Sequence, residues 1–212
     1  MSLRRREIDT PAGIARVHVE RPGPDVRNCG SLVLSHGAGG GIDSADLAAL
    51  RALVSQGWTY VRVEQPWRVT GKRIATPPRT LDVAWVSVLT ALTAGRWALP
   101  RPLVVGGRSA GARVACRTAT AVGADGVLAL SFPLVPPKGR PGRGPEAQLV
   151  LDAGLPLAVV QGERDPFGTP DDVRSVLSDA AWVYPVRGDH SLSRHPQDVV
   201  GAVRVWLATF VH

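Results

Sequence analysis

The sequence contains little of several residue types that mark particular classes of protein. Only 2 of its 212 residues are cysteines, and 5% are aromatic. Cys29 and Cys116 lie far apart within apolar segments, so we expect buried free thiols and neither a disulfide nor a metal site. The longest stretch without a charged residue, 28–42, has 15 residues, and five of them are glycines. A membrane-spanning helix needs roughly 20 apolar residues, so we expect no transmembrane span.

The N-terminal residues also lack the apolar stretch of a signal peptide. Arg4, Arg5 and Arg6 are followed at once by Glu7 and Asp9. We therefore expect a cytoplasmic protein. Hydrophobic residues make up 44% of the chain and charged residues 20%, with a mean hydropathy of +0.03. This balance predicts a chain that can bury a sizeable core, most simply as one domain over residues 1–212.

Basic residues outnumber acidic ones, mainly in the first half of the chain. The 25 lysines and arginines exceed the 18 aspartates and glutamates, for a net charge of +7. Up to Gly106 there are 14 basic and 8 acidic residues, and after it 11 and 10. Such an excess suggests nucleic-acid binding. Aromatic residues are scarce, however, and no segment interleaves them with basic residues, so we expect no nucleic-acid partner.

Short apolar segments rich in β-branched residues alternate with helical periodicities along the chain. This alternation predicts an α/β protein with a mostly parallel central sheet and helices on both of its faces. The first strand is expected to pair with residues 5–9 as an antiparallel hairpin across the turn 10–13. The predicted strands are 14–20, 31–35, 60–64, 103–107, 126–132, 157–161 and 182–186.

The sequence predicts four helices from their capping residues or their apolar faces. The first is capped by Asp43 or Ser44 and ends before Gly57. Another carries a buried stripe over residues 81–92, and a third begins with a cap at Thr169. The last helix presents Val199, Val203, Trp206, Leu207 and Phe210 to the core.

The segment 133–145 interrupts this pattern. Eight of its thirteen residues are proline or glycine, which predicts a loop without regular structure.

The strand at 103–107 runs into Gly107-Arg108-Ser109-Ala110-Gly111, a G-x-S-x-G sequence that a helix follows. This arrangement is typical of a nucleophile elbow, in which a strained serine sits at a sharp turn and small neighbours avoid collisions. The alternative is a glycine-rich turn that serves close packing or anion binding.

A catalytic serine needs a histidine base and a carboxylate that orients it, in the chain order Ser, acid, His. Asp165 follows the strand at 157–161, and His190 follows the strand at 182–186. We expect Asp165 to hold the imidazole and His190 to take the Ser109 proton. Three other acids are alternatives to Asp165, namely Glu163, Asp171 and Asp189. The four other histidines are more simply explained by structural roles; they are His18, His36, His195 and His212.

A tetrahedral oxyanion needs two backbone N–H donors. Ala110, which follows the serine, supplies the first. Ala38 fits the second, because the strand at 31–35 runs into the glycine-rich segment His36-Gly37-Ala38-Gly39-Gly40-Gly41. His36 is then a residue that holds this loop. A phosphate-binding loop is the rival interpretation, but no Lys-Ser/Thr pair follows.

With these segments in order, the sequence resembles the α/β-hydrolase superfamily, and more narrowly its small, lidless dienelactone-hydrolase-like group. The matching pieces span 31–210 and include 63–67, 106–113, 162–166 and 188–191. The resemblance implies an α/β-hydrolase fold with a minimal or absent cap. It also implies Ser109 as nucleophile, Asp165 as acid, His190 as base, and Ala38 and Ala110 as oxyanion donors. Dienelactone hydrolases carry cysteine at the nucleophile position, so their substrate does not transfer.

We therefore expect a serine hydrolase that cleaves a carboxylic ester or thioester through an acyl-enzyme, with no cofactor and no metal. The alternative is a non-catalytic interaction module with the same fold. Five basic residues and one acidic residue lie over 62–79, which suggests that Arg68 and Arg73, with Arg108 in the elbow, bind an anionic substrate. The competing interpretation is a solvated basic loop, with Arg108 and Arg113 in structural ion pairs.

Overall fold

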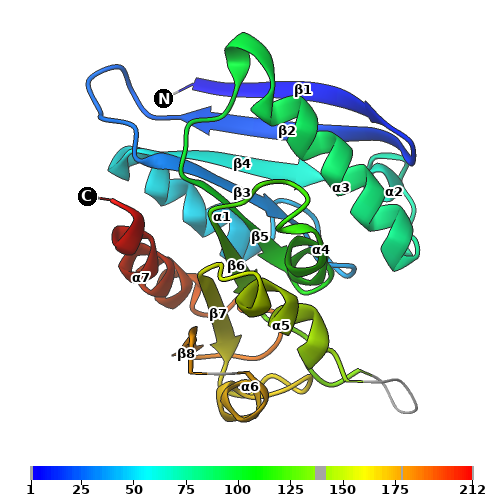
Figure 1. Cartoon of the computed structure of the whole chain (residues 1–212), viewed down its shortest axis with the longest axis vertical. Coiled ribbons are helices and arrows are strands. Elements are labelled where there is room, and N and C mark those ends of the chain that lie inside the picture. The colour runs from blue at the N-terminus through cyan, green and yellow to red at the C-terminus, as the bar shows by residue number, and fades with distance from the viewer. Residues whose placement is uncertain (1, 137–141, 178, 212) are drawn as a thin grey trace.

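The computed structural model describes residues 2–136, 142–177 and 179–211. Its centre is an eight-stranded sheet in the order β1-β2-β4-β3-β5-β6-β7-β8 (Figure 1). β2 runs antiparallel to both of its neighbours, β1 and β4, and the six strands β3 to β8 are parallel to one another. The predicted fold class is confirmed. The strands are β1 (Ser2–Thr10), β2 (Gly13–Arg21), β3 (Gly30–Ser35), β4 (Trp58–Glu64), β5 (Leu103–Arg108), β6 (Gly126–Leu130), β7 (Leu157–Gly162) and β8 (Ala181–Val186).

Helices cover both faces of the sheet, as the alternating pattern predicts. One core lies beneath α3 to α6 and contains Trp85, and the other lies beneath α1 and α7 and contains Trp206. Both tryptophans are fully buried. No helix in the described ranges is long and apolar enough to cross a membrane. The helices are α1 (Ala45–Ala49), α2 (Pro66–Val69), α3 (Pro78–Thr93), α4 (Ala110–Thr118), α5 (Gly144–Asp152), α6 (Pro170–Val176) and α7 (Pro196–Leu207).

Most predicted elements are confirmed, including the β1–β2 hairpin, the buried stripe of α3 and the capping box of Thr169 with Asp172. The strand at 126–132 is two residues too long, because Ser131 takes a left-handed conformation with φ of 46° and ends β6 at Leu130. The helix after Ser44 is α-helical only to Ala49 and continues as a 3₁₀ helix, η1 (Leu50–Gln56), up to Gly57. Its i, i+3 repeat places Leu50 and Leu53 on one buried face.

Two further predictions need correction. The loop over 133–145 ends at Arg143, because α5 begins at Gly144 and holds Pro145 in its first turn, where a missing N–H costs nothing. Residues 137–141 of that loop lie outside the described residues. Cys116 is a buried free thiol as predicted, and burial raises its pKa to about 12. Cys29 is also free but only half-buried, since it precedes β3 at the edge of the core.

The turn from β5 into α4 depends on very close backbone packing. A Cβ atom added to Gly107 or to Gly111 would lie 2.5 Å from the Ser35 carbonyl oxygen at the end of β3. Between these glycines Ser109 takes φ of 52° and ψ of −106°, a conformation that side-chain-bearing residues rarely adopt. Glycine on both sides therefore lets β3, β5 and α4 meet around a strained serine.

Substitution of Gly111 by alanine tests this packing. Because Ser35 contributes backbone atoms that cannot rotate away, Gly111→Ala is expected to lower the free energy of unfolding by about 1–3 kcal/mol. Gly201 in α7 is the matched control, since nothing lies within 4 Å of an added Cβ. Gly201→Ala is expected to raise stability by up to about 1 kcal/mol through helix propensity. Equal stability of the two variants in urea titrations would refute the packing argument.

Candidate active site

Three side chains that the sequence assigns to catalysis meet at the carboxyl edge of the sheet. Ser109 follows β5, Asp165 lies in the turn after β7, and His190 lies in the turn after β8. Loops at this edge are the usual place for ligand sites in parallel α/β sheets. The sheet order places β5, β7 and β8 on the same side of β3, with only β6 between β5 and β7.

The three side chains form a continuous hydrogen-bonded chain. Ser109 Oγ lies 2.9 Å from His190 Nε2, and His190 Nδ1 lies 2.8 Å from Asp165 Oδ2. The Asp165 side chain is fully buried, whereas that of His190 is 20% exposed. A carboxylate at this position requires the Nδ1–H tautomer, which leaves the Nε2 lone pair free to accept the serine proton.

Two residues that the sequence analysis missed hold the aspartate and the histidine. Gln161 Nε2 donates to Asp165 Oδ2 over 3.0 Å, and the Phe167 N–H donates to Asp165 Oδ1 over 2.8 Å. The Phe167 ring also packs edge-on against the His190 ring, with 4.6 Å between centroids. Gln161 could have been recognised from the sequence, because it is a polar residue near the end of an otherwise apolar strand. Nothing in the sequence marks Phe167.

The competing acids and the histidines at 18 and 195 lie outside this hydrogen-bonded chain. Asp189 Oδ1 accepts from the Ser191 N–H and hydroxyl, and these bonds lower its pKa. Asp171 pairs with Arg174 over 2.7 Å, and Glu163 is exposed. His18 lies within β2, and His195 precedes the first turn of α7. His212 lies outside the described residues.

His36 holds the glycine-rich loop, as the sequence analysis expects. Its Nδ1–H donates to the Gly37 carbonyl over 2.9 Å, and the Gln65 N–H donates to its Nε2 over 3.1 Å. The ring is buried and packs edge-on against Trp67. Burial lowers the pKa of His36, which favours the neutral ring that this pair of hydrogen bonds requires.

The two predicted oxyanion donors come from the start of α4 and from the loop after β3. Ala110 is the first residue of α4, so its N–H is one of the free donors at a helix start. Ala38 is an exposed residue of the loop that follows β3. That loop passes directly over the serine, because a Cβ on Gly37 would lie 3.3 Å from Ser109 Cβ.

Arg108 and Arg113 interact with protein groups, which favours the structural alternative for both. Arg108 is 9% exposed, donates from Nη2 to the His190 carbonyl over 2.9 Å, and pairs with Asp46. Arg113 makes two hydrogen bonds of 2.6 and 2.7 Å to Glu146. Burial would raise the pKa of Glu146, but the hydrogen bonds from Arg113 and the charge of Arg117 outweigh it and lower the pKa.

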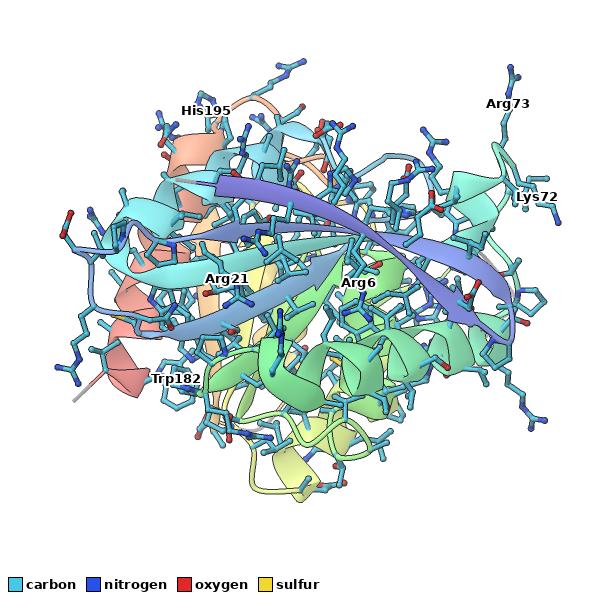
Figure 2. All side chains as sticks on the ribbon, turned by 90° about the horizontal axis from the view of Figure 1, so that it is seen from above. Arg6, Arg21, Lys72, Arg73, Trp182 and His195 are labelled. Atoms are coloured by element: carbon cyan, nitrogen blue, oxygen red, sulfur yellow. The ribbon has the colours of Figure 1, made fainter. Side chains whose placement is uncertain are left out.

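The other candidate substrate ligands lie around the loop after β4. Arg68 of α2 is half-buried, and its guanidinium lies 4.0 Å from a Cβ built on Gly41. Lys72 and Arg73 are exposed and project outward from one end of the molecule (Figure 2). Arg68 is therefore placed beside the glycine-rich loop.

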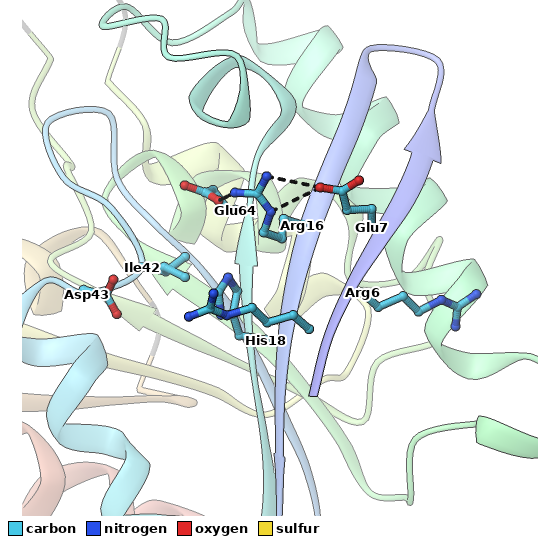
Figure 3. Close-up of a pocket in the computed structure, with 8 residues that line it drawn as sticks. Arg6, Glu7, Arg16, His18, Ile42, Asp43 and Glu64 are labelled. Carbon is cyan, nitrogen blue, oxygen red and sulfur yellow. Dashed lines mark hydrogen bonds and ion pairs between the residues drawn. The ribbon is translucent and has the colours of Figure 1, made fainter. Parts of the chain in front are cut away.

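Ion pairs on the sheet face beside this loop engage some of the basic residues of the first half of the chain. Arg16 bridges Glu7 and Glu64 over 3.1 and 3.2 Å at the rim of a cavity of about 430 Å³, while Arg6 points to the opposite side of β1 (Figure 3). His18 lines the same cavity, and burial lowers its pKa. Within the described part of the chain, no three histidine, cysteine or acidic side chains cluster as metal ligands would.

Comparisons with known proteins agree with this architecture. The family model described as "Alpha/beta hydrolase domain" matches residues 28–203. The structure is similar to that of XC6422 from Xanthomonas campestris, described as an a/b serine hydrolase without lid, with a TM-score of 0.79 and 20% identity over 100% of this chain and 96% of that one.

Two other solved structures have similar folds. An alpha-beta serine hydrolase homologue from Coxiella burnetii gives a TM-score of 0.76 and 16% identity, over 99% of this chain and 97% of that one. Est1E from Butyrivibrio proteoclasticus gives a TM-score of 0.75 and 14% identity, over 97% of this chain and 98% of that one. A search of curated proteins found no match. Since the family model spans most of the sequence, the chain belongs to the alpha/beta hydrolase domain family.

Proposed function

We propose that this protein is a serine hydrolase that cleaves a carboxylic ester or thioester through an acyl-enzyme. The observation that carries the proposal is the chain of two hydrogen bonds, of 2.9 and 2.8 Å, from Ser109 through His190 to Asp165. A serine hydroxyl is a weak nucleophile unless a neighbouring base takes its proton as it attacks. His190 is in reach to do so, and the buried carboxylate of Asp165 stabilises the imidazolium that forms.

The reaction proceeds in two halves on these groups. Ser109 Oγ attacks the carbonyl carbon while His190 Nε2 takes the hydroxyl proton, and a tetrahedral oxyanion forms. The Ala38 and Ala110 N–H groups stabilise this anion, each by about 3 kcal/mol if they act as single oxyanion donors do elsewhere. His190 then returns the proton to the departing alcohol or thiol. Water then attacks the acyl carbon while His190 Nε2 takes one of its protons. The second tetrahedral intermediate collapses with cleavage of the acyl–Oγ bond, and His190 returns the proton to Ser109 Oγ as the acid leaves.

The similar structures support this reaction class. XC6422 is described as a serine hydrolase, and Est1E is described with ferulic acid bound. The segment between β6 and α5 covers only residues 131–143, which favours an open site for a small-molecule substrate. Arg68, with Arg73 further out, would favour a substrate that carries a carboxylate or phosphate, because both belong to the loop and helix after β4.

A fluorophosphonate probe tests the nucleophile. We expect the wild-type protein to be labelled and Ser109→Ala to show no labelling, because the probe reacts only with an activated serine. Ser193→Ala is the control, since Ser193 is exposed and outside the hydrogen-bonded chain, and it should label like the wild type. A folded wild-type protein that never labels would contradict the proposal and favour a non-catalytic interaction module.

Charged and neutral esters of equal chain length test the anionic substrate. Arg68→Ala is expected to raise KM for anionic esters about fivefold, the factor that about 1 kcal/mol represents, and to leave KM for neutral esters unchanged. Arg73→Ala should have a smaller effect of the same kind, because its side chain projects outward. Arg204→Ala on α7 is the control. Equal changes for both esters would remove the anion-binding role.

A further inference from the structure

Arg108 contacts three of the segments that build the site, although it is not itself in the hydrogen-bonded chain. Its Nη2 donates to the backbone carbonyl of His190 over 2.9 Å. Its Nη1 lies 3.4 Å from Cβ atoms built on Gly37 and Gly40, on either side of Ala38. Its Nε lies 3.3 Å from Asp46 Oδ2 in α1. One planar cation thus donates to the loop that holds His190, pairs with α1, and lies beside the glycine-rich loop that contains Ala38.

The electrostatics of Asp46 explain why this cation stays in place. The Asp46 side chain is 0% exposed, and neither of its carboxylate oxygens has a hydrogen-bond partner among the residues that the structure describes. A buried carboxylate without compensation is expensive, because the interior does not solvate charge as water does. The Arg108 guanidinium is the cation that pairs with it. The ion pair therefore anchors one end of Arg108, and the other nitrogens are held against the two loops.

We propose that Arg108 is a positioning residue that fixes His190 and the Ala38 loop relative to Ser109, an inference that rests on the proposed function. The residue adjoins the nucleophile in sequence, so its guanidinium transmits the position of the elbow to the base and to one oxyanion donor. The planar guanidinium of arginine has three nitrogens that can face three partners at once. The ammonium group of lysine is a single point charge and cannot reach all three. A displacement of about 1 Å in such groups costs as much as 100-fold in rate.

Four variants separate positioning from simple charge neutralisation. Arg108→Gln removes the cation, and Arg108→Lys keeps the charge but loses the fork. The double variant Asp46→Asn with Arg108→Gln removes both buried charges and so restores stability without restoring the contact to His190. Arg113→Gln is the matched control, because Arg113 lies in the helix that follows the elbow and pairs with Glu146.

The first measurement is the rate of fluorophosphonate labelling and of ester hydrolysis in variants that fold by circular dichroism. We expect kcat and the labelling rate to fall about 10- to 100-fold in Arg108→Gln and in the double variant, with KM within about twofold of wild type. Arg108→Lys should recover part of the rate, and Arg113→Gln should match the wild type. Full recovery in the double variant, or a loss confined to KM, would overturn the inference.

The second measurement does not depend on catalysis. In proton NMR, the His190 Nδ1–H that bonds Asp165 should give a downfield resonance that disappears in His190→Ala. We expect this resonance to broaden or exchange faster in Arg108→Gln and in the double variant, and to stay unchanged in Arg113→Gln. If the Arg108 variants broaden the resonance but the wild type is never labelled, the proposed function fails while the positioning role stands. An unchanged resonance in every Arg108 variant would refute that role.

Discussion

Close backbone contact between the end of β3 and the two glycines around Ser109 is the constraint on which the site depends. The Ser35 carbonyl leaves no room for a side chain at Gly107 or Gly111, so β5 must turn sharply into α4 and hold the serine at a positive φ. The hydroxyl then stands at the carboxyl edge of the sheet. The position of this hydroxyl is the reference for the other groups of the site. The packed cores on both faces of the sheet stabilise the strained backbone of Ser109.

The parallel register of the later strands brings the remaining groups to the serine. β7 and β8 pair over six residues, so the turns that follow them lie side by side and place Asp165 against His190. Buried polar contacts then fix each group, with Gln161 and the Phe167 N–H on the carboxylate and Arg108 on the histidine backbone. Some of the basic residues that first suggest a nucleic-acid partner form internal ion pairs, as Arg108 does with Asp46 and Arg113 with Glu146.

The fold and the three side chains of the hydrogen-bonded chain could be predicted because their signals are local. Each strand is a short apolar segment; Ser109 follows one directly, and Asp165 and His190 lie in the turns after two others. The environment of Arg108 could not be predicted, because its partners, Asp46 and the His190 carbonyl, come from distant segments. The start of α5 could not be predicted, because it lies in a segment rich in proline and glycine. The 3₁₀ helix after Ala49 could not be predicted either, because the spacing of Leu50 and Leu53 also fits an α-helix.

Acylation of Ser109 during turnover is tested most directly by mass spectrometry of the protein mixed with a p-nitrophenyl ester. We expect a covalent acyl group on the peptide that contains Ser109, which forms with the burst of p-nitrophenol and decays as the acid is released. Turnover without such an adduct, or an adduct on another residue, would contradict it.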